Sequence, residues 1–344
     1  MTQSHDLNAL GWSAYFQRQL KIDKIGGLMP ARVSAVHRDR IDALTEAGLI
    51  SLHLPPGLTT GEVAVGDWVL INPSRDRVAR VLDRKSLLHR RAAGVDARDQ
   101  LIAANVDTLF ITTSMNADFN PARLERYLAL AYEGGAVPVF VLTKADLCAD
   151  PAPYHDTLRQ IAPLVPVVTL DARDPDSGGK LADWCGPGQT VALLGSSGVG
   201  KSTLAATLTG DAIATRAIRE GDARGRHTTT AREFHPTAGG GWLIDTPGMR
   251  ELQLAGTEAG IDAVFDDIAD FSLHCRFSDC AHDTEPGCAV KAAAEEGRLE
   301  PDRLARWQKL KREDAHNTRS LAEAHSRART FGKMAKQTIK EKKR

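Results

Sequence analysis

Eight consecutive residues, Gly195–Ser202, read GSSGVGKS and constrain the possible fold of this chain more than any other feature. They follow a short apolar run, Thr190–Leu194, and lead into a segment with Leu204 and Leu208 on one helical face. A strand, a glycine-rich loop and a helix in that order form a phosphate-binding loop, in which backbone N–H groups at the helix N-terminus surround phosphate oxygens. The sequence therefore predicts an α/β domain that binds a nucleotide.

The residues of this loop have distinct expected roles. Lys201 is expected to reach the β- and γ-phosphates, and the Ser202 hydroxyl is expected to bind Mg²⁺. The other residues predicted to contact the nucleotide here are Gly195, Ser196, Ser197, Gly198, Val199, Gly200 and Thr203. A glycine-rich turn that binds nothing is the alternative, and the complete motif in its strand-to-helix context disfavours it.

A second phosphate element comes after the loop along the chain. The apolar run Trp242–Ile244 leads into Asp245-Thr246-Pro247-Gly248. The Asp245 carboxylate is expected to hold Mg²⁺ through water, and the Gly248 N–H to face the γ-phosphate. Taken alone, this string also fits a strand followed by an ordinary Pro-Gly turn. Because a phosphate loop is present in the same chain, the nucleotide-binding interpretation of this string is favoured over an ordinary turn.

The segment Thr143-Lys144-Ala145-Asp146 is predicted to select the base. It follows the buried-strand pattern Val137–Leu142, which places it at the carboxyl end of a strand, where open α/β sheets bind ligands. The Asp146 carboxylate can accept hydrogen bonds from guanine N1–H and its amine, whereas adenine would leave the carboxylate unpaired. GTP is therefore predicted rather than ATP. Thr143 stands where this element usually has Asn, so a side-chain amide contact is lost, and a surface turn remains the alternative for so short a string.

The base segment lies about fifty residues before the phosphate loop, whereas in most GTPases it comes after the loop. This order indicates a circularly permuted GTPase domain. One consequence is that the segment after the phosphate loop and the DTPG strand lie at the end of this domain and lead directly into the C-terminal domain. We therefore expect the nucleotide state to influence the C-terminal domain.

Three cysteines and a histidine cluster near the C-terminus, separated by four, one and five residues. They are Cys275, Cys280, His282 and Cys288. Three thiolates and one imidazole complete a tetrahedral set for Zn²⁺ and leave no position for water, which predicts a structural site. A disulfide or inert buried cysteines are the alternatives. Cys148 and Cys185 lie apart from the cluster and are interpreted as small hydrophobic residues.

Length and composition fit a multidomain cytoplasmic protein. The 344 residues, 42% of them hydrophobic, suffice for two or three cores. Met1–Leu10 lacks a charged region followed by an apolar one, and no apolar run approaches the length of a membrane span. The 44 basic and 44 acidic residues cancel, but Arg327–Arg344 contains eight Lys or Arg and one Glu. This tail is expected to pair with phosphates of a partner, or else to aid solubility only.

Four alternating segments precede the GTPase motifs and predict a small antiparallel barrel, for which an OB-fold is expected. They are Ala31–His37, Leu49–Leu54, Asp67–Ile71 and Val78–Leu82. Trp68 is expected to pack inside this barrel rather than to stack on a base. A basic set either faces RNA or forms a solvated edge: Arg75, Arg77, Arg80 and Arg84. Near the C-terminus, Leu304, Trp307 and Leu310 predict the packing face of a helix.

The serial order of these motifs resembles the RsgA/YjeQ family of circularly permuted GTPases that act on the small ribosomal subunit. The resemblance spans nearly the whole chain. Besides the base segment, the phosphate loop and DTPG, it is carried by Ala104–Asp107 (ANVD), Gly225–Thr230 (GRHTTT) and Glu285–Cys288 (EPGC). The cysteine cluster also matches the family position by position.

The resemblance implies an N-terminal OB-fold β-barrel, a permuted α/β P-loop GTPase domain and a mainly helical, zinc-binding C-terminal domain. The expected boundaries are an N-terminal extension at 1–30, the barrel at 31–90, the GTPase domain at 91–258, the zinc domain at 259–320 and a basic tail at 321–344.

The resemblance also implies residue roles that the motifs alone do not give. His227 is expected to be catalytic and Thr229, chosen over Thr228, to bind Mg²⁺. Many GTPases position the attacking water with a Gln after the DTPG-like glycine, but Met249 stands there and cannot do so. A polar loop residue without a catalytic role is the alternative for His227. Ala172 is expected to contact the base, although Asp171 stands where the family usually has Ser.

The function implied is a GTP-hydrolysing factor in late assembly of the small (30S) subunit, stimulated by that subunit. Expected partners are 16S rRNA and GTP or GDP, with one structural Zn²⁺ per chain and Mg²⁺ bound with GTP. No membrane association is expected, and the chain is expected to be a monomer. Two alternatives stay open: an rRNA-binding scaffold that uses GTP as a switch with negligible turnover, and a translation factor on complete ribosomes.

Overall fold

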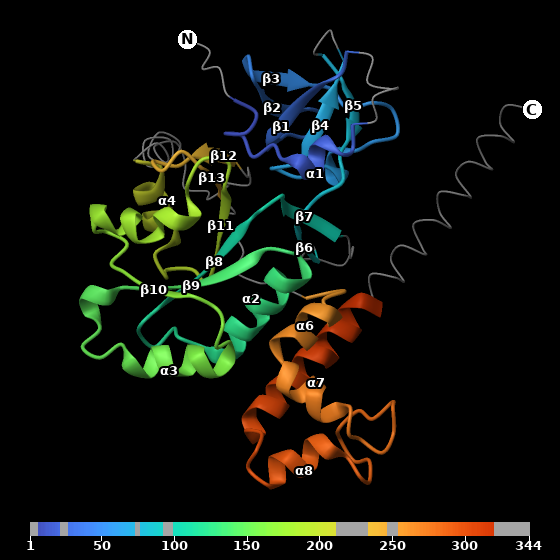
Figure 1. Cartoon of the computed structure of the whole chain (residues 1–344), viewed down its shortest axis with the longest axis vertical. Coiled ribbons are helices and arrows are strands. Elements are labelled where there is room, and N and C mark those ends of the chain that lie inside the picture. Colours follow the sequence, from blue (N-terminus) through green and yellow to red (C-terminus); the bar gives the residue numbers. More distant parts are fainter. Residues whose placement is uncertain are drawn as a thin grey trace, which may run out of the picture. The chain divides into compact units, whose positions relative to one another are not determined.

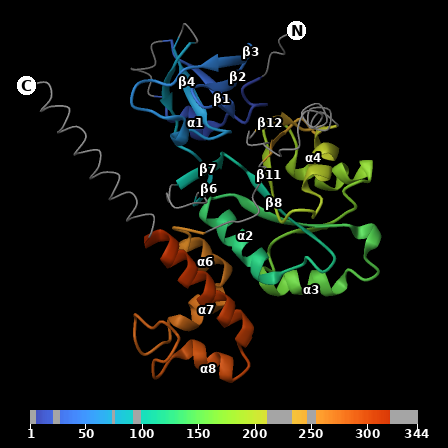
Figure 2. The ribbon, with the colours of Figure 1, turned by 180° about the vertical axis from the view of Figure 1, so that it is seen from behind.

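The chain forms two compact units, shown from two sides in Figures 1 and 2. The first comprises Met1–His89, Leu101–Tyr127 and Gly134–Glu251, and the second comprises Arg90–Gln100, Leu128–Glu133 and Leu252–Arg344. Within them, the computed structural model describes residues 6–20, 27–72, 76–91, 99–210, 233–245 and 254–319. In this part of the chain, no helix combines the length and apolar character that crossing a membrane requires.

A five-stranded barrel opens the first unit. Its strands are β1 (Met29–Val36), β2 (Ile41–Thr45), β3 (Gly48–Leu52), β4 (Trp68–Ile71) and β5 (Val78–Val81). β1 pairs antiparallel with β2 and β4, β2 with β3, and β4 with β5. A bridge between His53 and Arg77 connects the β3 side to β5 and completes the circuit. The predicted OB-fold is therefore confirmed, with β2 as the strand that the sequence pattern missed.

The barrel interior is apolar, and a short N-terminal segment packs against its outer side. Val33, Ile41 and Val69 are among the buried residues of its core. Trp68 is fully buried, as predicted, but not in the barrel interior. It lies on the outer side, against the rings of Trp12 and of Phe16, which belongs to α1 (Ala14–Gln17). Its indole therefore cannot stack on a nucleic-acid base.

The basic set of the barrel divides between two environments. Arg77 and Arg80 are exposed, whereas Arg84 donates to both carboxylate oxygens of the buried Asp67, at 2.6 and 2.8 Å. Arg75 lies outside the described residues. Arg84 thus stabilises the barrel, and among the described members of the set Arg77 and Arg80 stay available for a partner.

In the described residues, six further strands continue from the barrel as part of one 11-stranded sheet, in the order β10-β9-β8-β11-β13-β12. These strands are β8 (Thr108–Ser114), β9 (Val137–Thr143), β10 (Val167–Thr169), β11 (Thr190–Leu194), β12 (Glu233–Pro236) and β13 (Trp242–Asp245). All neighbours run parallel except the antiparallel pair β12 and β13. Parallel strands align their carboxyl ends, so the base segment after β9 and the phosphate loop after β11 lie at the same edge.

Helices cover both faces of this sheet (Figure 1). α4 (Lys201–Thr209) lies on one side, and α2 (Pro121–Glu133) and α3 (Ala152–Ile161) lie on the other. Leu204 and Leu208 of α4 are buried against Val191 and Leu193 of β11, as the sequence pattern predicts. The 3₁₀ helix η4 (Pro175–Trp184) packs beside α4. Cys185 is buried in the same core and is a small hydrophobic residue there.

A buried arginine joins the barrel to the sheet. Arg32 of β1 is 1% exposed, and its Nη2 donates to Asn105 O at 3.1 Å and to Thr190 Oγ1 at 2.8 Å. Its Nη1 donates to Leu10 O, and its guanidinium lies 4.6 Å from the ring centroid of Phe234. Burial lowers the pKa of Arg32 to about 10, so the side chain stays charged at neutral pH.

The ANVD string lies at this junction. Asn105 Nδ2 donates to Gly66 O at 2.9 Å, and its Oδ1 accepts from Lys85 N at 2.9 Å. Asp107 Oδ2 accepts from Thr190 N at 2.8 Å. β1 also pairs directly with β12, where Ala35 faces Glu233. These contacts make barrel and sheet one packed unit, which gives the string a structural role.

We expect Arg32→Met to lower the free energy of unfolding of the first unit by about 2 to 3 kcal/mol. Methionine retains most of the buried stem but leaves Asn105 O and Thr190 Oγ1 without their donor, and each unsatisfied buried group is destabilising. Urea titration followed by tryptophan fluorescence measures the loss. Arg80→Met, at an exposed position of the same barrel, is the matched control, and equal stability of the two variants would contradict the proposed tie.

The second unit is mainly helical. It contains α6 (Glu258–Val264), α7 (Asp266–Ser272), α8 (Ala289–Glu295) and a helix over residues 301–319. Leu310 is buried, in agreement with the predicted packing face. A small separate sheet, β6 (Leu87–Arg91) with β7 (Asp99–Ala104), contributes residues to both units. The cysteine cluster lies between α7 and α8, within the loop over residues 273–288.

Candidate functional site

The phosphate loop adopts a conformation that needs its glycines. A Cβ on Gly195 would lie 2.1 Å from Thr112 O of β8, which no side chain tolerates. Gly198 and Gly200 have φ values of 81° and 101°, in the region that L side chains rarely adopt. The loop leads directly into α4, so its N–H groups lie at the positive end of that helix.

The lysine of the loop is held in place by backbone carbonyls. Lys201 Nζ donates to Gly195 O at 2.7 Å and to Ser196 O at 2.5 Å. These bonds place the ammonium against the first residues of the loop. Ser197, Ser202 and Thr203 are exposed around the start of α4, so their side chains are accessible to a ligand.

An arginine from α2 braces the outer side of the loop. Arg123 Nη1 donates to Ser196 Oγ and to both carboxylate oxygens of Asp118, at 3.0 and 3.2 Å. Tyr127, one turn further along α2, also hydrogen-bonds Ser196, while burial raises the pKa of its phenol. No motif signals this contact, because it joins residues 73 positions apart.

The base segment and the phosphate loop share one cavity of about 220 Å³. The predicted base contacts that line it are Thr143, Lys144, Asp146 and Ala172. From the phosphate loop and α4 it is lined by Gly198, Val199, Gly200 and Thr203. Residues predicted from separate stretches of sequence therefore meet at one place.

Thr143 connects the two segments directly. Its Oγ1 donates to Val199 O at 2.5 Å, with Thr113 O further away at 3.2 Å. A hydroxyl has a single proton, so this bond leaves it no donor for a base. The next residue, Lys144, has φ 60° and turns the chain into the 3₁₀ helix η3 (Ala145–Leu147), which carries Asp146. The threonine therefore ties the base segment to the loop.

Two further charged residues line this cavity. Arg173 Nη2 donates to Asp146 Oδ2 at 2.5 Å, and Asp171 Oδ1 accepts from Arg173 N at 3.0 Å. The hydrogen bonds from the Arg173 backbone and side chain lower the pKa of Asp171. The pKa of Arg173 is raised, first by its hydrogen bond to Asp171 and then by the charge of Asp146. The sequence motif singled out Asp171 as a departure but did not indicate Arg173.

Of the remaining predicted residues, Asp245 belongs to the described part of the chain. Asp245 ends β13, the parallel neighbour of β11, and so lies at the same edge as the phosphate loop. His227, Thr229 and Gly248 lie outside the described residues, as does the GRHTTT string.

The cysteine cluster brings four ligand atoms together. His282 Nδ1 lies 3.4 Å from Cys288 Sγ and 3.6 Å from Cys275 Sγ, and these two sulfurs are 4.0 Å apart. With Cys280, all four ligand atoms lie within 4.8 Å of one another. Zinc bonds of about 2.3 Å to sulfur and 2.0 Å to nitrogen require separations of about 3.5 to 3.8 Å in a tetrahedron. The donor set therefore fits a metal ion, and the sulfur separation excludes a Cys275–Cys288 disulfide.

The EPGC glutamate organises the loop around the cluster. Glu285 accepts from the backbone N–H of Ala281 and Asp283 at 2.9 Å and from Thr284 at 3.1 Å. These bonds, the one from Ala281 first, lower the pKa of Glu285 to about 2. Its carboxylate is thus charged at any pH at which the cysteines could bind a metal.

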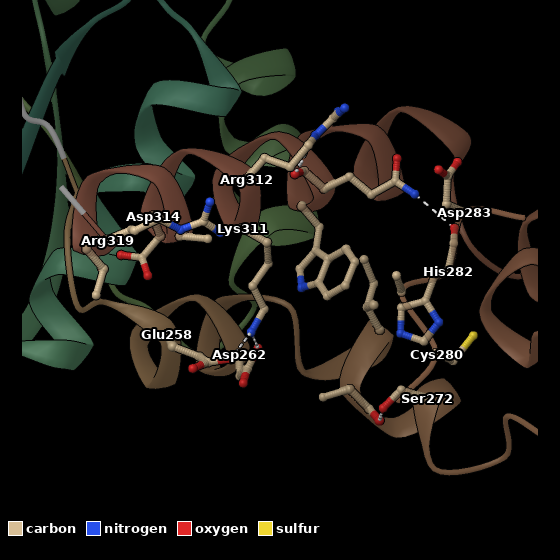
Figure 3. A pocket seen from close by; sticks show the side chains of 17 residues that line it. Glu258, Asp262, Ser272, Cys280, His282, Asp283, Lys311, Arg312, Asp314 and Arg319 are labelled. Atoms are coloured by element: carbon tan, nitrogen blue, oxygen red, sulfur yellow. Dashed lines mark hydrogen bonds and ion pairs between the residues drawn. The ribbon is translucent and has the colours of Figure 1, made fainter. Parts of the chain in front are cut away.

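The helix over residues 301–319 supports the cluster from the other side, along a cavity of about 850 Å³ (Figure 3). Gln308 Nε2 donates to His282 O at 2.9 Å, and the Trp307 ring lies 5.3 Å from the His282 ring. Further along, Lys311 points to Asp262 and Glu258, at 2.8 and 3.2 Å. These ion pairs hold α6 against the last helix.

The comparisons with known proteins agree with this geometry. The family model of the RsgA GTPase matches residues 81–255. A small ribosomal subunit biogenesis GTPase RsgA from Mesorhizobium japonicum is 54% identical over 319 residues, which is 92% of this chain and 92% of that protein. The chain belongs to the RsgA GTPase family. The predicted resemblance and the GTPase class are therefore confirmed.

A second relative and two solved structures also match most of the chain. A small ribosomal subunit biogenesis GTPase RsgA 2 from Vibrio parahaemolyticus is 48% identical over 345 residues, covering 100% of this chain and 96% of its own. The crystal structure of YjeQ from Thermotoga maritima superposes with a TM-score of 0.60 at 25% identity, covering 82% of this chain and 97% of that one. YloQ, a circularly permuted GTPase, shares the fold with a TM-score of 0.59 at 22% identity, over 90% of this chain and 99% of that one.

Proposed function

We propose that this protein hydrolyses GTP and acts in late assembly of the small (30S) ribosomal subunit. The observation that carries the proposal is the shared cavity, in which Asp146 of the base segment meets Gly198 and Gly200 of the phosphate loop. A base-reading carboxylate beside a phosphate loop is the arrangement that a guanine nucleotide requires. The cellular role is supported by the RsgA relatives, which are named small ribosomal subunit biogenesis GTPases.

The reaction is transfer of the γ-phosphoryl group to water. The bond between the γ-phosphorus and the β–γ bridging oxygen breaks, a bond to the water oxygen forms, and GDP and phosphate leave. Lys201 would bind the β- and γ-phosphates, and Ser202, Thr229 and Asp245 would hold Mg²⁺, which neutralises phosphate charge. His227 would orient the attacking water. Backbone N–H groups of the loop would bind the remaining phosphate oxygens.

The second unit would contribute a metal-stabilised surface. We assign one structural Zn²⁺ to Cys275, Cys280, His282 and Cys288, because the set is complete and Glu285 and Gln308 already fix the surrounding backbone. The exposed barrel arginines and the basic tail at 321–344 would contact phosphates of 16S rRNA. The protein would act as a monomer in the cytoplasm. Its domains would have the boundaries that the sequence analysis predicts.

GTP turnover tests this function when it is measured with purified small subunits, large subunits and complete ribosomes. We expect slow turnover by the protein alone and strong stimulation by small subunits only. Equal stimulation by complete ribosomes would favour a translation factor. Binding of GTP without stimulated turnover on any particle would favour a scaffold that uses GTP as a switch.

Asp146→Ala tests the base assignment within the same function. Because the carboxylate would pair with both guanine N1–H and the amine, its loss should weaken GTP binding by about 2 to 3 kcal/mol. Nucleotide titration of both proteins measures this change, and Asp156→Ala, at an exposed position of α3, is the matched control. Equal affinity of the unmodified protein for GTP and ATP would refute the guanine assignment.

A further inference from the structure

The base cavity contains an acid–base pair whose role the GTPase motifs do not explain. Besides its bond to Asp146, Arg173 donates to Asp171 through Nε and Nη2, both at 3.3 Å, and through its backbone N–H at 3.0 Å. The guanidinium is therefore held between two carboxylates that line the cavity. Among the described residues, Nη1 of Arg173 has no hydrogen-bond partner. This nitrogen can therefore donate to a ligand.

A guanidinium offers only donors, and the edge of the purine beside Asp146 differs between the two bases. Guanine carries the O6 acceptor next to the N1–H that Asp146 would read, whereas adenine carries an amine donor at that place. A donor beside Asp146 is thus complementary to guanine and repelled by adenine. Arginine is the side chain that most often contacts guanine O6 in proteins that read nucleic-acid bases.

The fixed position of Thr143 means that its hydroxyl does not donate to this acceptor. Its only hydroxyl proton is directed at Val199 O, 2.5 Å away. Among the described residues, Arg173 is the cationic side chain that forms an ion pair with the Asp146 carboxylate. Thr143 in place of the Asn that is usual in this element, and Asp171 in place of the Ser that is usual in the family, then have one explanation.

We propose that Arg173 is a second base-reading residue, donating to guanine O6 while Asp146 accepts from N1–H and the amine, and that Asp171 is the positioning residue that orients it. The inference rests on the proposed GTP site and adds a specificity determinant to it. The nucleotide selected is one that presents an oxygen acceptor at position 6 of its purine.

The test compares GDP with 6-thioguanosine diphosphate, which keeps N1–H, the amine and N7 but replaces O6 with a weaker acceptor. Isothermal titration of the full chain gives both dissociation constants for the unmodified protein and for Arg173→Ala, Arg173→Lys and Asp171→Asn. We expect Arg173→Ala to weaken GDP binding about five- to tenfold, as for one exposed hydrogen bond from a charged donor, and to reduce the preference for GDP over the thio analogue by a similar factor. Arg173→Lys and Asp171→Asn should each show a smaller loss of the same preference.

Two results would overturn this role. Tighter GDP binding by Arg173→Ala would mean that the arginine only occupies Asp146, and an equal loss for both nucleotides would mean that it only supports the loop. Arg159→Ala, at an exposed position of α3 paired with Asp156, is the matched control and should change neither constant. If the unmodified protein binds neither GDP nor its analogue, the proposed GTP site itself fails, and this is seen before any variant is compared.

Discussion

Removal of the metal from the cluster of Cys275, Cys280, His282 and Cys288 is expected to unfold the helical C-terminal domain, which belongs to the second unit. GTP binding is expected to persist. The loop over residues 273–288 has little apolar core of its own, since Leu273 and Phe277 are 81% and 42% exposed. Its backbone is held by Glu285, Gln308 and the four ligands. Structural zinc stabilises comparable small domains by about 10 to 16 kcal/mol at neutral pH. No other group in this loop supplies a term of that size.

Hydrogen exchange followed peptide by peptide measures this effect. With a chelator, amides of the loop and of α8 should lose protection, whereas those of β11 and α4 should keep it and a nucleotide titration should be unchanged. Metal analysis should find about one zinc per chain in the untreated protein. Cys288→Ala should lose the metal, and Cys185→Ala, at a buried cysteine outside the cluster, should retain it. A metal-free protein with full protection in this loop would contradict the assignment.

Local signals in the sequence were sufficient for the phosphate loop and its flanking elements. The predicted strand Thr190–Leu194 is β11 without change, and the helix begins at Lys201 as expected. The reason is that glycine φ values, an apolar strand and a leucine-lined helix face all depend on neighbours a few residues away. The fold class could be predicted because the serial order of motifs determines which strands must lie side by side.

Contacts between distant residues could not be predicted in this way. Thr143 in place of an amide predicts a lost contact, but the structure shows a hydroxyl bond to Val199, 56 residues away. Arg32 gave no signal of burial, because an arginine on a strand normally points to solvent and its acceptors come from three separate segments. β2 was missed since its five residues, IDALT, do not alternate cleanly.

The nucleotide site shows the same division. Asp146 was predicted from its place at a strand end and Ala172 from the family resemblance, and both line one cavity with the phosphate loop. Arg123 and Arg173 were not predicted. Arg123 bonds Ser196 and Arg173 bonds Asp146, and in both cases the partner is distant in the sequence. Basic residues on surface segments are common, so only coordinates separate these two from solvated arginines.

His227→Ala is expected to abolish most of the stimulation of GTP turnover by small ribosomal subunits. With Met249 in place of the usual Gln, the unassisted protein should be slow, on the order of 10⁻⁴ to 10⁻³ s⁻¹, because nothing fixes the attacking water. Contacts of rRNA phosphates with the barrel and the basic tail would favour the catalytic arrangement, in which the His227 imidazole lies at the γ-phosphate. Stimulation should therefore be strong and should fall as salt concentration rises.

Single-turnover hydrolysis with saturating small subunits separates a catalytic role of His227 from a binding role. A group that acts only in the transition state lowers turnover without changing GTP affinity, so the dissociation constant of His227→Ala should stay within about twofold of the unmodified protein. His155→Ala is the matched control, because His155 lies on α3 and bonds Thr169 rather than the nucleotide site. If the His227 variant is stimulated as strongly as the control, the water is positioned by another group, and one supplied by the ribosomal particle becomes the next hypothesis to test.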